Sequence, residues 1–527
     1  MMNKLLLLFG VVVLTFSCPC WSANILAFLP TFARSHYGAF QPMLKELAVR
    51  GHNLTVLSHF PLKDPPPNYH HIDVSMKKNE FAYKNKNDSI LNKVKFLKPL
   101  TIPIGIIFLG TKINEQTLNN KKVQEFIEAD GYQFDLVIFE NFQHECFVAM
   151  GHKYGAPVVQ LIPATPTAFV SQWHSQPFHP AYIPDQNSGF TDRMPFFDRL
   201  TNVLVALLQL TLYPLFYMPK QTEIMNKYFN YTGWETRPTL EEMTKNISLT
   251  LMNAHFTIGS PRPLVPSFVQ VAGMHLKPAS PLPNDLQEIM DNSPNGVVYF
   301  SFGSVVQAMH LPKETVTMFL RQLGKLKQTV LWKWESTDLP ELPANVIVRK
   351  WFPQVDILGH PNCTLFITHG GVHSTVEAVY YGVPMLAIAI FGDQWYNSIM
   401  MQTRGAAIRI KYTELTEDIF EDSLIKILND KTYQVNAKEL SRRFKDQPLK
   451  PVDRAVYWIE YVIRHKGAHH LKTAANNLNW FQLLLIDVVG VILISLFIFI
   501  YLLKKILKLC CYCITRRSKI DSQKKSQ

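Results

Sequence analysis

A strand–helix–strand rhythm is the feature that most constrains what this chain can fold into. Apolar, strand-like runs alternate with amphipathic stretches that end in glycine, and such βαβ units imply a parallel sheet covered by helices. Residues 32–40, which contain a histidine, read as the turn after the first strand. The segments that carry the rhythm are NILAFLP (24–30), PMLKELAVRGH (42–52), NLTVLSH (53–59), YQFDLVIFE (132–140) and APVVQLI (156–162).

The same rhythm starts again after a proline-rich linker, KPASPLPN (277–284). A chain of 527 residues is too long for one core. We therefore predict two doubly wound, Rossmann-like α/β domains, residues 23–278 and 285–465, that face a cleft and bind ligands at the carboxyl ends of their strands. Residues 165–250, rich in aromatic residues and proline, read as inserted helices and loops, whose aromatic side chains either line a pocket or pack as core.

Both ends of the chain indicate the secretory pathway. Residues 1–22 have the layout of a cleaved signal peptide. Residues 480–503 form an apolar run with Asp487 as its only charge, which is long enough for a transmembrane helix. The tail, 504–527, carries eight Lys or Arg residues and one Asp, a net +7 of the chain's +12. The basic charge therefore indicates a positive-inside tail and not a surface for nucleic acid.

These features predict a single-pass type I protein with its body in the lumen of the endoplasmic reticulum. Lys524-Lys525 is typical of a retrieval signal in a cytosolic tail. Because only Cys146 and Cys363 remain in the lumenal part, we expect no disulfide framework. Candidate glycosylation sites are Asn53, Asn87, Asn230 and Asn246, whereas the sequon at Asn362 adjoins a motif that we expect to be buried.

The stretch FITHGGVHSTVEA (366–378) places a histidine, two glycines, two hydroxyls and a glutamate where a strand passes into a helix. Glycines let a ligand approach the backbone, and the free N–H groups of a helix start bind phosphate. A carboxylate one turn further along can accept hydrogen bonds from two ribose hydroxyls. The stretch predicts a site for a nucleoside diphosphate, although by itself it fits the capped start of a core helix equally well.

Together with KWFPQVDILGHP (350–361) and GVPMLAIAIFGDQWYN (382–397), this stretch resembles the signature of the UDP-glycosyltransferase family, in its animal membrane-bound branch. The resemblance implies a GT-B fold, in which the first domain binds the acceptor and the second binds the UDP-sugar. It also implies donor-binding positions: Trp351 on uracil, Gln354 at the ribose or the base edge, Glu377 at the ribose diol, Asp393 and Gln394 at sugar hydroxyls, and Ser304, His369, Gly371, Ser374 and Thr375 at the diphosphate. His373 stands where many relatives have asparagine.

The resemblance also assigns the catalytic base. His36 follows the first predicted strand, and a histidine suits the removal of a proton from an acceptor hydroxyl. A carboxylate should orient its ring. The family usually has aspartate after the strand at 132–140, where this chain has Glu140; Glu145 is a rival, and we favour Glu140. Asp135 reads as a structural residue.

The function that follows is inverting transfer of a hexosyl group from a UDP-sugar to the hydroxyl of a small lipophilic acceptor. The sequence contains no D-x-D motif and no HExxH motif, so we expect neither a metal nor another cofactor. Glucose and glucuronic acid both remain open as the sugar, and a homo- or hetero-oligomer is possible. The alternative is a non-catalytic protein of the same fold that binds lipophiles or UDP-sugars, which predicts damage at His36 or Glu377; neither residue is replaced.

Overall fold

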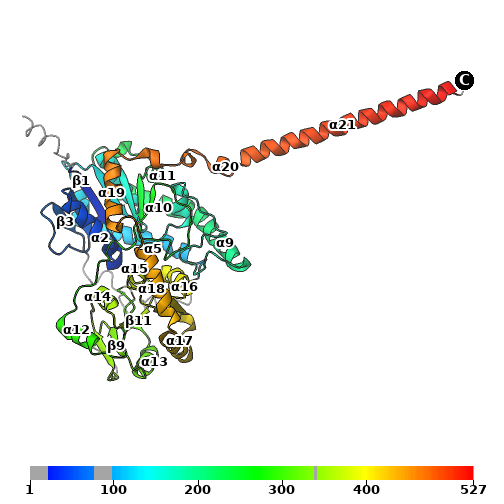
Figure 1. Ribbon diagram of the computed structural model, residues 1–527. Helices are drawn as coiled ribbons and strands as arrows, with labels where there is room; N and C mark the ends of the chain where they lie inside the picture. The colour runs from blue at the N-terminus through cyan, green and yellow to red at the C-terminus, as the bar shows by residue number, and fades with distance from the viewer. Residues whose placement is uncertain (1–21, 76–97, 305, 337–340, 526–527) are drawn as a thin grey trace, which may run out of the picture. The chain divides into compact units, whose positions relative to one another are not determined.

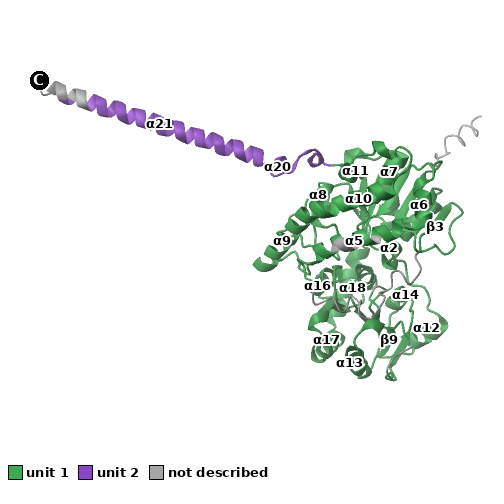
Figure 2. Ribbon diagram, turned by 180° about the vertical axis from the view of Figure 1, so that it is seen from behind, with its two compact units in different colours: residues 1–472 green, residues 473–527 purple. Residues whose placement is uncertain are grey.

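The structure, a computed structural model, describes residues 22–75, 98–304, 306–336 and 341–525 (Figure 1). It divides into two compact units, residues 1–472 and 473–527 (Figure 2). Most of the predicted signal peptide and the sequon at Asn87 lie outside the described residues. The first unit contains two parallel sheets, and we call each sheet with its helices a lobe. The predicted class, two doubly wound α/β domains, is confirmed.

The first lobe is built on a seven-stranded parallel sheet in the order β3-β2-β1-β4-β5-β6-β7. Side chains of β1 alternate between the two faces: Leu26 and Phe28 join one apolar core, while Ile25, Ala27 and Leu29 join the other. Both faces of the sheet are therefore buried, as parallel sheets require. The strands are β1 (Asn24–Leu29), β2 (Asn53–Ser58), β3 (Tyr69–Asp73), β4 (Leu136–Glu140), β5 (Val158–Ile162), β6 (Leu249–Met252) and β7 (Phe268–Gln270).

Helices cover both faces of this sheet, and several of them come from the inserted region that the sequence predicts between residues 165 and 250. They are α2 (Arg34–Val49), α5 (Ile102–Leu118), α6 (Lys121–Glu128), α7 (Ala149–Tyr154), α8 (Ala168–Trp173), α9 (Phe196–Leu212), α10 (Met218–Tyr228) and α11 (Leu240–Lys245). A π-helical turn, η4 (Tyr213–Tyr217), joins α9 to α10.

The predicted start of the first helix is wrong. We expected residues 32–40 to form a turn and the helix to begin after it, in PMLKELAVRGH (42–52). Instead α2 begins at Arg34 and Pro42 lies inside it. The consequence is functional, because His36 lies in the first turn of a helix and not in a free loop.

The second lobe has a six-stranded parallel sheet in the order β10-β9-β8-β11-β12-β13. Its strands are β8 (Val297–Ser301), β9 (Thr329–Lys333), β10 (Val346–Arg349), β11 (Cys363–Thr368), β12 (Met385–Ala389) and β13 (Ala407–Lys411). Its helices are α12 (Asn284–Asp291), α13 (Lys313–Gly324), α14 (Gln354–Gly359), α15 (Val372–Tyr381), α16 (Asp393–Thr403), α17 (Glu417–Asn429) and α18 (Thr432–Lys445).

The helix at the end of the predicted second domain packs on the first sheet. In α19 (Pro451–Arg464), the buried side chains Ala455, Val456 and Ile459 join the core formed by α2 and the first sheet. We had predicted that this segment belongs to the second domain, residues 285–465. The spacing of apolar residues along a helix shows which of its faces is buried, but not which sheet that face covers. The sequence alone therefore could not assign α19 to the first sheet.

Cys146 and Cys363 are both buried, and their thiols are free. Among the sequons, Asn230 and Asn246 are exposed, while Asn53 is half-buried on β2 and donates to the Oδ1 atom of Asn24. Asn362 is half-buried, and its side chain donates to the carbonyl oxygen of Met290.

The second unit is largely one helix. After a short turn, α20 (Trp480–Leu483), the chain bends at Leu485, whose φ is 56°, and α21 runs over Ile486–Lys525. Residues Ile486–Ser518 are long and apolar enough to cross a membrane. The span predicted from residue 480 is therefore interrupted near its start, and its helix continues through the basic tail.

Candidate active site

In both lobes the predicted site residues lie at the same place in the sheet, where the order of the strands reverses. In the first sheet the chain reverses its winding between β1 and β4, and in the second between β8 and β11. At such a switch point the loops that follow two adjacent strands diverge, which leaves a ligand-sized gap at the carboxyl ends of the strands. His36 and Glu140 follow or end β1 and β4, while Ser304 and His369 follow β8 and β11.

At the first switch point His36 pairs with Glu140. The distance from His36 Nδ1 to Glu140 Oε1 is 2.6 Å, and the Glu140 side chain is fully buried, whereas His36 remains 19% exposed. Burial acts to raise the pKa of the Glu140 carboxyl, but the charge and hydrogen bond of His36 outweigh it, so that pKa is lowered. An ionised carboxylate therefore holds one ring nitrogen. The Nε2 atom makes no hydrogen bond to the described residues and is the nitrogen available to a substrate.

Glu145, the rival partner, is used elsewhere. Its Oε2 atom accepts a hydrogen bond from the Tyr217 hydroxyl of η4, and burial raises the pKa of its carboxyl to about 7. Asp135 accepts a hydrogen bond from the backbone N–H of Asn24 at 2.8 Å, which ties β1 to the segment before β4. Glu140 is thus the carboxylate that contacts His36, and Asp135 has the structural contact expected of it.

The second switch point is shaped around the ring of His369. This side chain is buried, and the pKa of its imidazole is lowered to about 4 by burial and by Lys333. A Cβ atom on Gly303 would lie 2.8 Å from His369 Cε1, and one on Gly371 would lie 2.6 Å from its Nε2. Gly303 also has a φ of 77°, in the left-handed region. Both loops therefore require glycine to pack against the histidine.

The first turns of α14 and α15 are joined by hydrogen bonds. Gln354 donates through Nε2 to Ser374 Oγ at 3.1 Å and to Glu377 Oε2. Burial raises the pKa of the Glu377 carboxyl, although His373 and Gln354 act in the opposite direction. Thr375 is buried in the same turn, and its hydroxyl has no hydrogen-bond partner among the described residues. Three of the predicted residues, Gln354, Ser374 and Glu377, are thus joined by hydrogen bonds.

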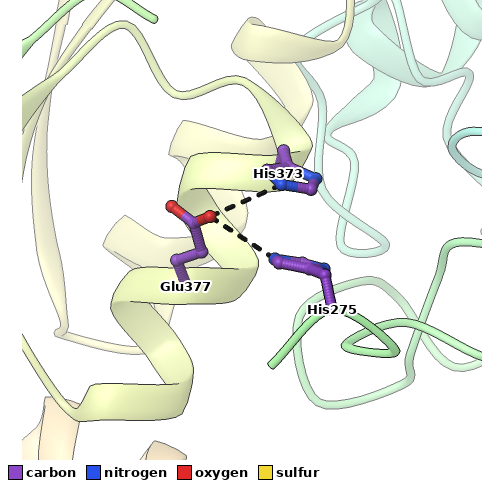
Figure 3. Close-up of side chains that lie close together, drawn as sticks. All are labelled: His275, His373 and Glu377. Atoms are coloured by element: carbon purple, nitrogen blue, oxygen red, sulfur yellow. Dashed lines mark ion pairs between the residues drawn. The ribbon is translucent and has the colours of Figure 1, made fainter. Parts of the chain in front are cut away.

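His275, which the sequence analysis did not single out, completes this group (Figure 3). It follows β7, and its ring stacks on that of His373 with centroids 3.8 Å apart. The Nε2 atoms of His275 and His373 lie 3.5 and 3.4 Å from Glu377 Oε1. Burial lowers the pKa of both imidazoles to about 3, so both rings are neutral. The only sequence signal was a histidine just before the linker.

Two imidazoles and a carboxylate are donors that suit zinc, and their ligand atoms lie within 4.8 Å of one another. The rings, however, are nearly parallel, at 17°. A nitrogen lone pair lies in the plane of its ring, so the two lone pairs do not converge on one point. A shared ion would require one ring to turn. The observed arrangement instead lets two neutral imidazoles face the Glu377 carboxylate.

The predicted sugar-binding pair lies at the start of α16. Asp393 Oδ2 accepts hydrogen bonds from the Val372 N–H at 3.2 Å and from Asn397 Nδ2 at 2.8 Å. Burial raises the pKa of its carboxyl. Gln394 is buried, and its Oε1 accepts from the backbone N–H groups of Ile390 and Phe391. The two side chains therefore also fix the loop between β12 and α16.

The side chain of Trp351 is 59% exposed. It lies after β10, and the Arg34 guanidinium at the start of α2 lies 5.3 Å from its ring centroid. A second contact brings the lobes together nearby, because a Cβ atom on Gly38 would lie 3.8 Å from His373 Cε1. The start of α2, with His36, thus faces the start of α15. Ser304 is exposed in the loop after β8.

Comparison with known proteins gives a consistent result. Residues 25–524 match the family model described as "UDP-glucoronosyl and UDP-glucosyl transferase". UDP-glucosyltransferase 2 of Dactylopius coccus is 36% identical over 96% of this chain and 96% of its own. Human UDP-glucuronosyltransferase 2B7 is 33% identical over 92% of this chain and 93% of its own.

A solved structure with the same fold is a UDP-glucosyltransferase from Polygonum tinctorium capable of glucosylating indoxyl, in complex with 3,4-dichloroaniline. It covers 84% of this chain and 99% of its own, with a TM-score of 0.57 and 14% identity. At this identity the likeness concerns the fold alone, and it agrees with the two-lobed GT-B arrangement predicted from the sequence.

Proposed function

The chain belongs to the family of UDP-glucuronosyl and UDP-glucosyl transferases and is a UDP-glycosyltransferase; from this premise we propose that it transfers a hexosyl group to the hydroxyl of a small lipophilic acceptor, with inversion, and that His36 is the general base. The observation that carries the proposal is the contact of His36 Nδ1 with the fully buried Glu140 carboxylate at 2.6 Å.

The reaction needs a base beside the acceptor hydroxyl. Glu140 holds Nδ1 of His36 as the protonated nitrogen, which leaves the Nε2 lone pair for the acceptor O–H. As this proton moves to Nε2, the acceptor oxygen bonds to the anomeric carbon and the bond from that carbon to the UDP oxygen breaks. Glu140 stabilises the imidazolium that forms, by the same logic as the carboxylate of a serine-hydrolase triad. A single displacement of this kind inverts the anomeric centre.

The donor is held by the second lobe. Trp351 offers an exposed aromatic face to uracil, Glu377 and Gln354 lie together for the ribose, and Asp393 offers a carboxylate to sugar hydroxyls. For the diphosphate we propose the residues at or near the start of α15 and the loop after β8: His369, Gly371, Ser374, Thr375 and Ser304. Helix starts stabilise anions through free N–H groups, so we expect the leaving UDP to need no metal or other cofactor.

The setting of the enzyme is part of the proposal. The apolar helix α21 and the basic tail support a single-pass type I protein, and Lys524-Lys525 supports retrieval to the endoplasmic reticulum with the two lobes in its lumen. The relatives are named glucosyl- and glucuronosyltransferases, so UDP-glucose and UDP-glucuronic acid are the two donors to test.

The test measures UDP release by membranes that contain the full chain, with a panel of phenols and each donor in parallel. Turnover with one donor identifies the sugar, and analysis of the product anomer checks inversion. His36→Ala should abolish turnover while UDP still binds, and His70→Ala, an exposed histidine on β3, is the matched control. Equal activity of wild type and His36→Ala would exclude His36 as base, and UDP binding without turnover across the panel would favour the binding-protein alternative.

A further inference from the structure

The helix α21 continues past its apolar part into the basic tail as a single helix (Figure 1). Its apolar part ends at Leu503, and Lys504 and Lys505 follow directly. Residues 486–503 span ~27 Å at about 1.5 Å per residue, which is close to the ~30 Å thickness of the hydrocarbon core. Basic residues directly after a span mark the cytosolic interface. In the proposed topology, the turns that begin at Lys504 therefore lie at the cytosolic surface of the membrane.

These turns are amphipathic. Side chains three, four, seven or eight residues apart share one face of a helix, and this spacing separates an apolar face from a basic one. Arg517, four residues after Cys513, ends the apolar face, while Leu509 lies at the boundary and Tyr512 on the basic face. The apolar face consists of Ile506, Leu507, Cys510, Cys513 and Ile514, and the basic face contains Lys504, Lys505, Lys508, Cys511 and Arg516.

The described cysteines fall into two classes. Cys146 and Cys363 are buried in the lobes, whereas Cys510, Cys511 and Cys513 are exposed, and all five are free. Thiols stay reduced in the cytosol, so an exposed thiol beside a membrane is available for chemical modification. Two of the three exposed thiols lie on the apolar face, and the third lies among the lysines.

The apolar face has no cover among the described residues. Ile506, Leu507 and Ile514 are 57%, 55% and 68% exposed. Cys510 comes seven residues after Leu503, so a straight helix would carry it ~10 Å past the hydrocarbon core, to the outer edge of the headgroups. A helix with one apolar and one lysine-rich face is most stable along the bilayer interface. Lying there returns the thiols of the apolar face to the boundary of the acyl chains, with the lysines among anionic headgroups.

We propose that Cys510 and Cys513 are sites of S-acylation by long-chain fatty acyl groups, with α21 lying along the cytosolic interface from Lys504 onward. Cys511 stays free, because its face of the helix is turned to the headgroups. The proposal goes beyond the transferase reaction of the two lobes, and it rests on α21 being the anchor and on a cytosolic tail.

The acyl donor is a long-chain acyl-coenzyme A, and a membrane acyltransferase of the cell catalyses the step. The cysteine sulfur attacks the acyl carbonyl carbon and forms a thioester. The bond from that carbon to the sulfur of coenzyme A breaks, and free coenzyme A leaves with the proton of the cysteine thiol. Each acyl chain buries its CH₂ groups in the bilayer, which holds this turn of α21 at the interface until the thioester is cleaved. Residues 514–523 then limit how far Lys524-Lys525 reaches from the membrane.

The test counts free and acylated thiols of the full chain in intact microsomes. A membrane-impermeant maleimide coupled to polyethylene glycol adds a fixed mass to each free cytosolic thiol, and it does not reach Cys146 or Cys363, which are buried and lie in the lumen in the proposed topology. We expect one adduct, at Cys511. Neutral hydroxylamine cleaves thioesters, so after this treatment we expect three adducts.

Metabolic labelling with an alkyne analogue of palmitic acid identifies the group that hydroxylamine removes. Cys510→Ser/Cys513→Ser should reduce the hydroxylamine-sensitive label at least about tenfold, whereas Cys511→Ser, the matched control, should stay within about twofold of wild type. Both variants should release UDP as fast as wild type with a water-soluble phenol, because the tail is no part of the two lobes. The label itself does not depend on turnover, so a failure of the proposed reaction would leave this test intact.

Each outcome decides the proposal. One adduct before hydroxylamine and three after it, with label lost only in Cys510→Ser/Cys513→Ser, support it. Three adducts without hydroxylamine would show that no tail thiol is acylated and would overturn it. Equal loss of label in Cys511→Ser, or no adduct before hydroxylamine and three after it, would refute the choice of face. Adducts that form only after detergent would place the tail in the lumen and remove the premise.

Discussion

Replacing Glu140 with glutamine tests the proposed mechanism most directly. The substitution keeps the size of the side chain and an oxygen that can accept from His36 Nδ1, but it removes the charge. Glu140 is fully buried and lies 2.6 Å from the ring nitrogen, so little water screens the pair. The variant therefore separates the orienting role of the side chain from its electrostatic role.

The expected size of the effect follows from the geometry. With charge centres roughly 4 Å apart and an effective dielectric constant of about 20, a carboxylate and an imidazolium attract by ~4 kcal/mol. The imidazolium exists only once the acceptor proton has moved, so this attraction favours the transition state over the ground state. Each ~1.4 kcal/mol corresponds to a tenfold change in rate. Since the amide retains the hydrogen bond, we expect kcat to fall by about 10²–10³-fold.

The assay is steady-state UDP release as a function of pH, together with equilibrium binding of UDP. A neutral partner no longer stabilises the imidazolium that forms as the proton moves, so the plateau of the kcat/KM profile should fall. UDP affinity should not change, because Glu140 belongs to the other lobe. Glu140→Asp keeps the charge on a shorter side chain, and its kcat should lie between those of wild type and Glu140→Gln. Glu145→Gln, which removes the buried carboxyl bonded to Tyr217, should leave the pH profile in place.

Two results would refute the reasoning. If Glu140→Gln turned over within about threefold of wild type, its charge would not act in the transition state, and the 2.6 Å contact would be structural. If Glu140→Asp were as inactive as Glu140→Gln while both bound UDP normally, position and not charge would be the requirement.

Three further predictions concern the donor site and stability. Trp351→Ala should weaken UDP binding by about 10–100-fold, the usual contribution of a base stacked on an aromatic ring, whereas kcat should change much less. An unchanged UDP affinity in calorimetry would show that Trp351 does not bind uracil. Glu377→Gln should reduce the preference for UDP over 2′-deoxy-UDP, because the carboxylate is proposed to bind the ribose diol, and a preference equal to that of wild type would contradict this role. Burial raises the pKa of the Glu145 carboxyl from 4.5 to about 7, so its protonated form stabilises the fold; this contribution is complete below the unfolded pKa and is lost as pH rises through about 7. The fall in melting temperature between pH 5 and pH 7.5 should therefore be smaller in Glu145→Gln than in wild type, and parallel curves would exclude a titrating Glu145.

The sequence predicted the parts of the fold that repeat at short range. The alternation of apolar runs with glycine-ended amphipathic stretches is a local signal, and it located β1, β2, β4 and β5 closely. The prediction failed where the local sequence pattern is compatible with more than one structure. Pro42 lies inside α2 although proline is disfavoured in a helix interior, so the start of α2 was misplaced. It also could not decide which sheet α19 covers, because the partner of an apolar helix face is a long-range fact.

The candidate site shows the same division. The family signature is contiguous in sequence, so the residues from Trp351 to Gln394 could be named in advance. His275 could not, because it reaches Glu377 only through the close approach of the loop after β7 to α15. The choice between Glu140 and Glu145 was likewise open. Both residues lie at or just after the end of the same predicted strand, and the sequence does not show which side chain points toward α2. Only the backbone path, which turns Glu145 toward Tyr217, separates them.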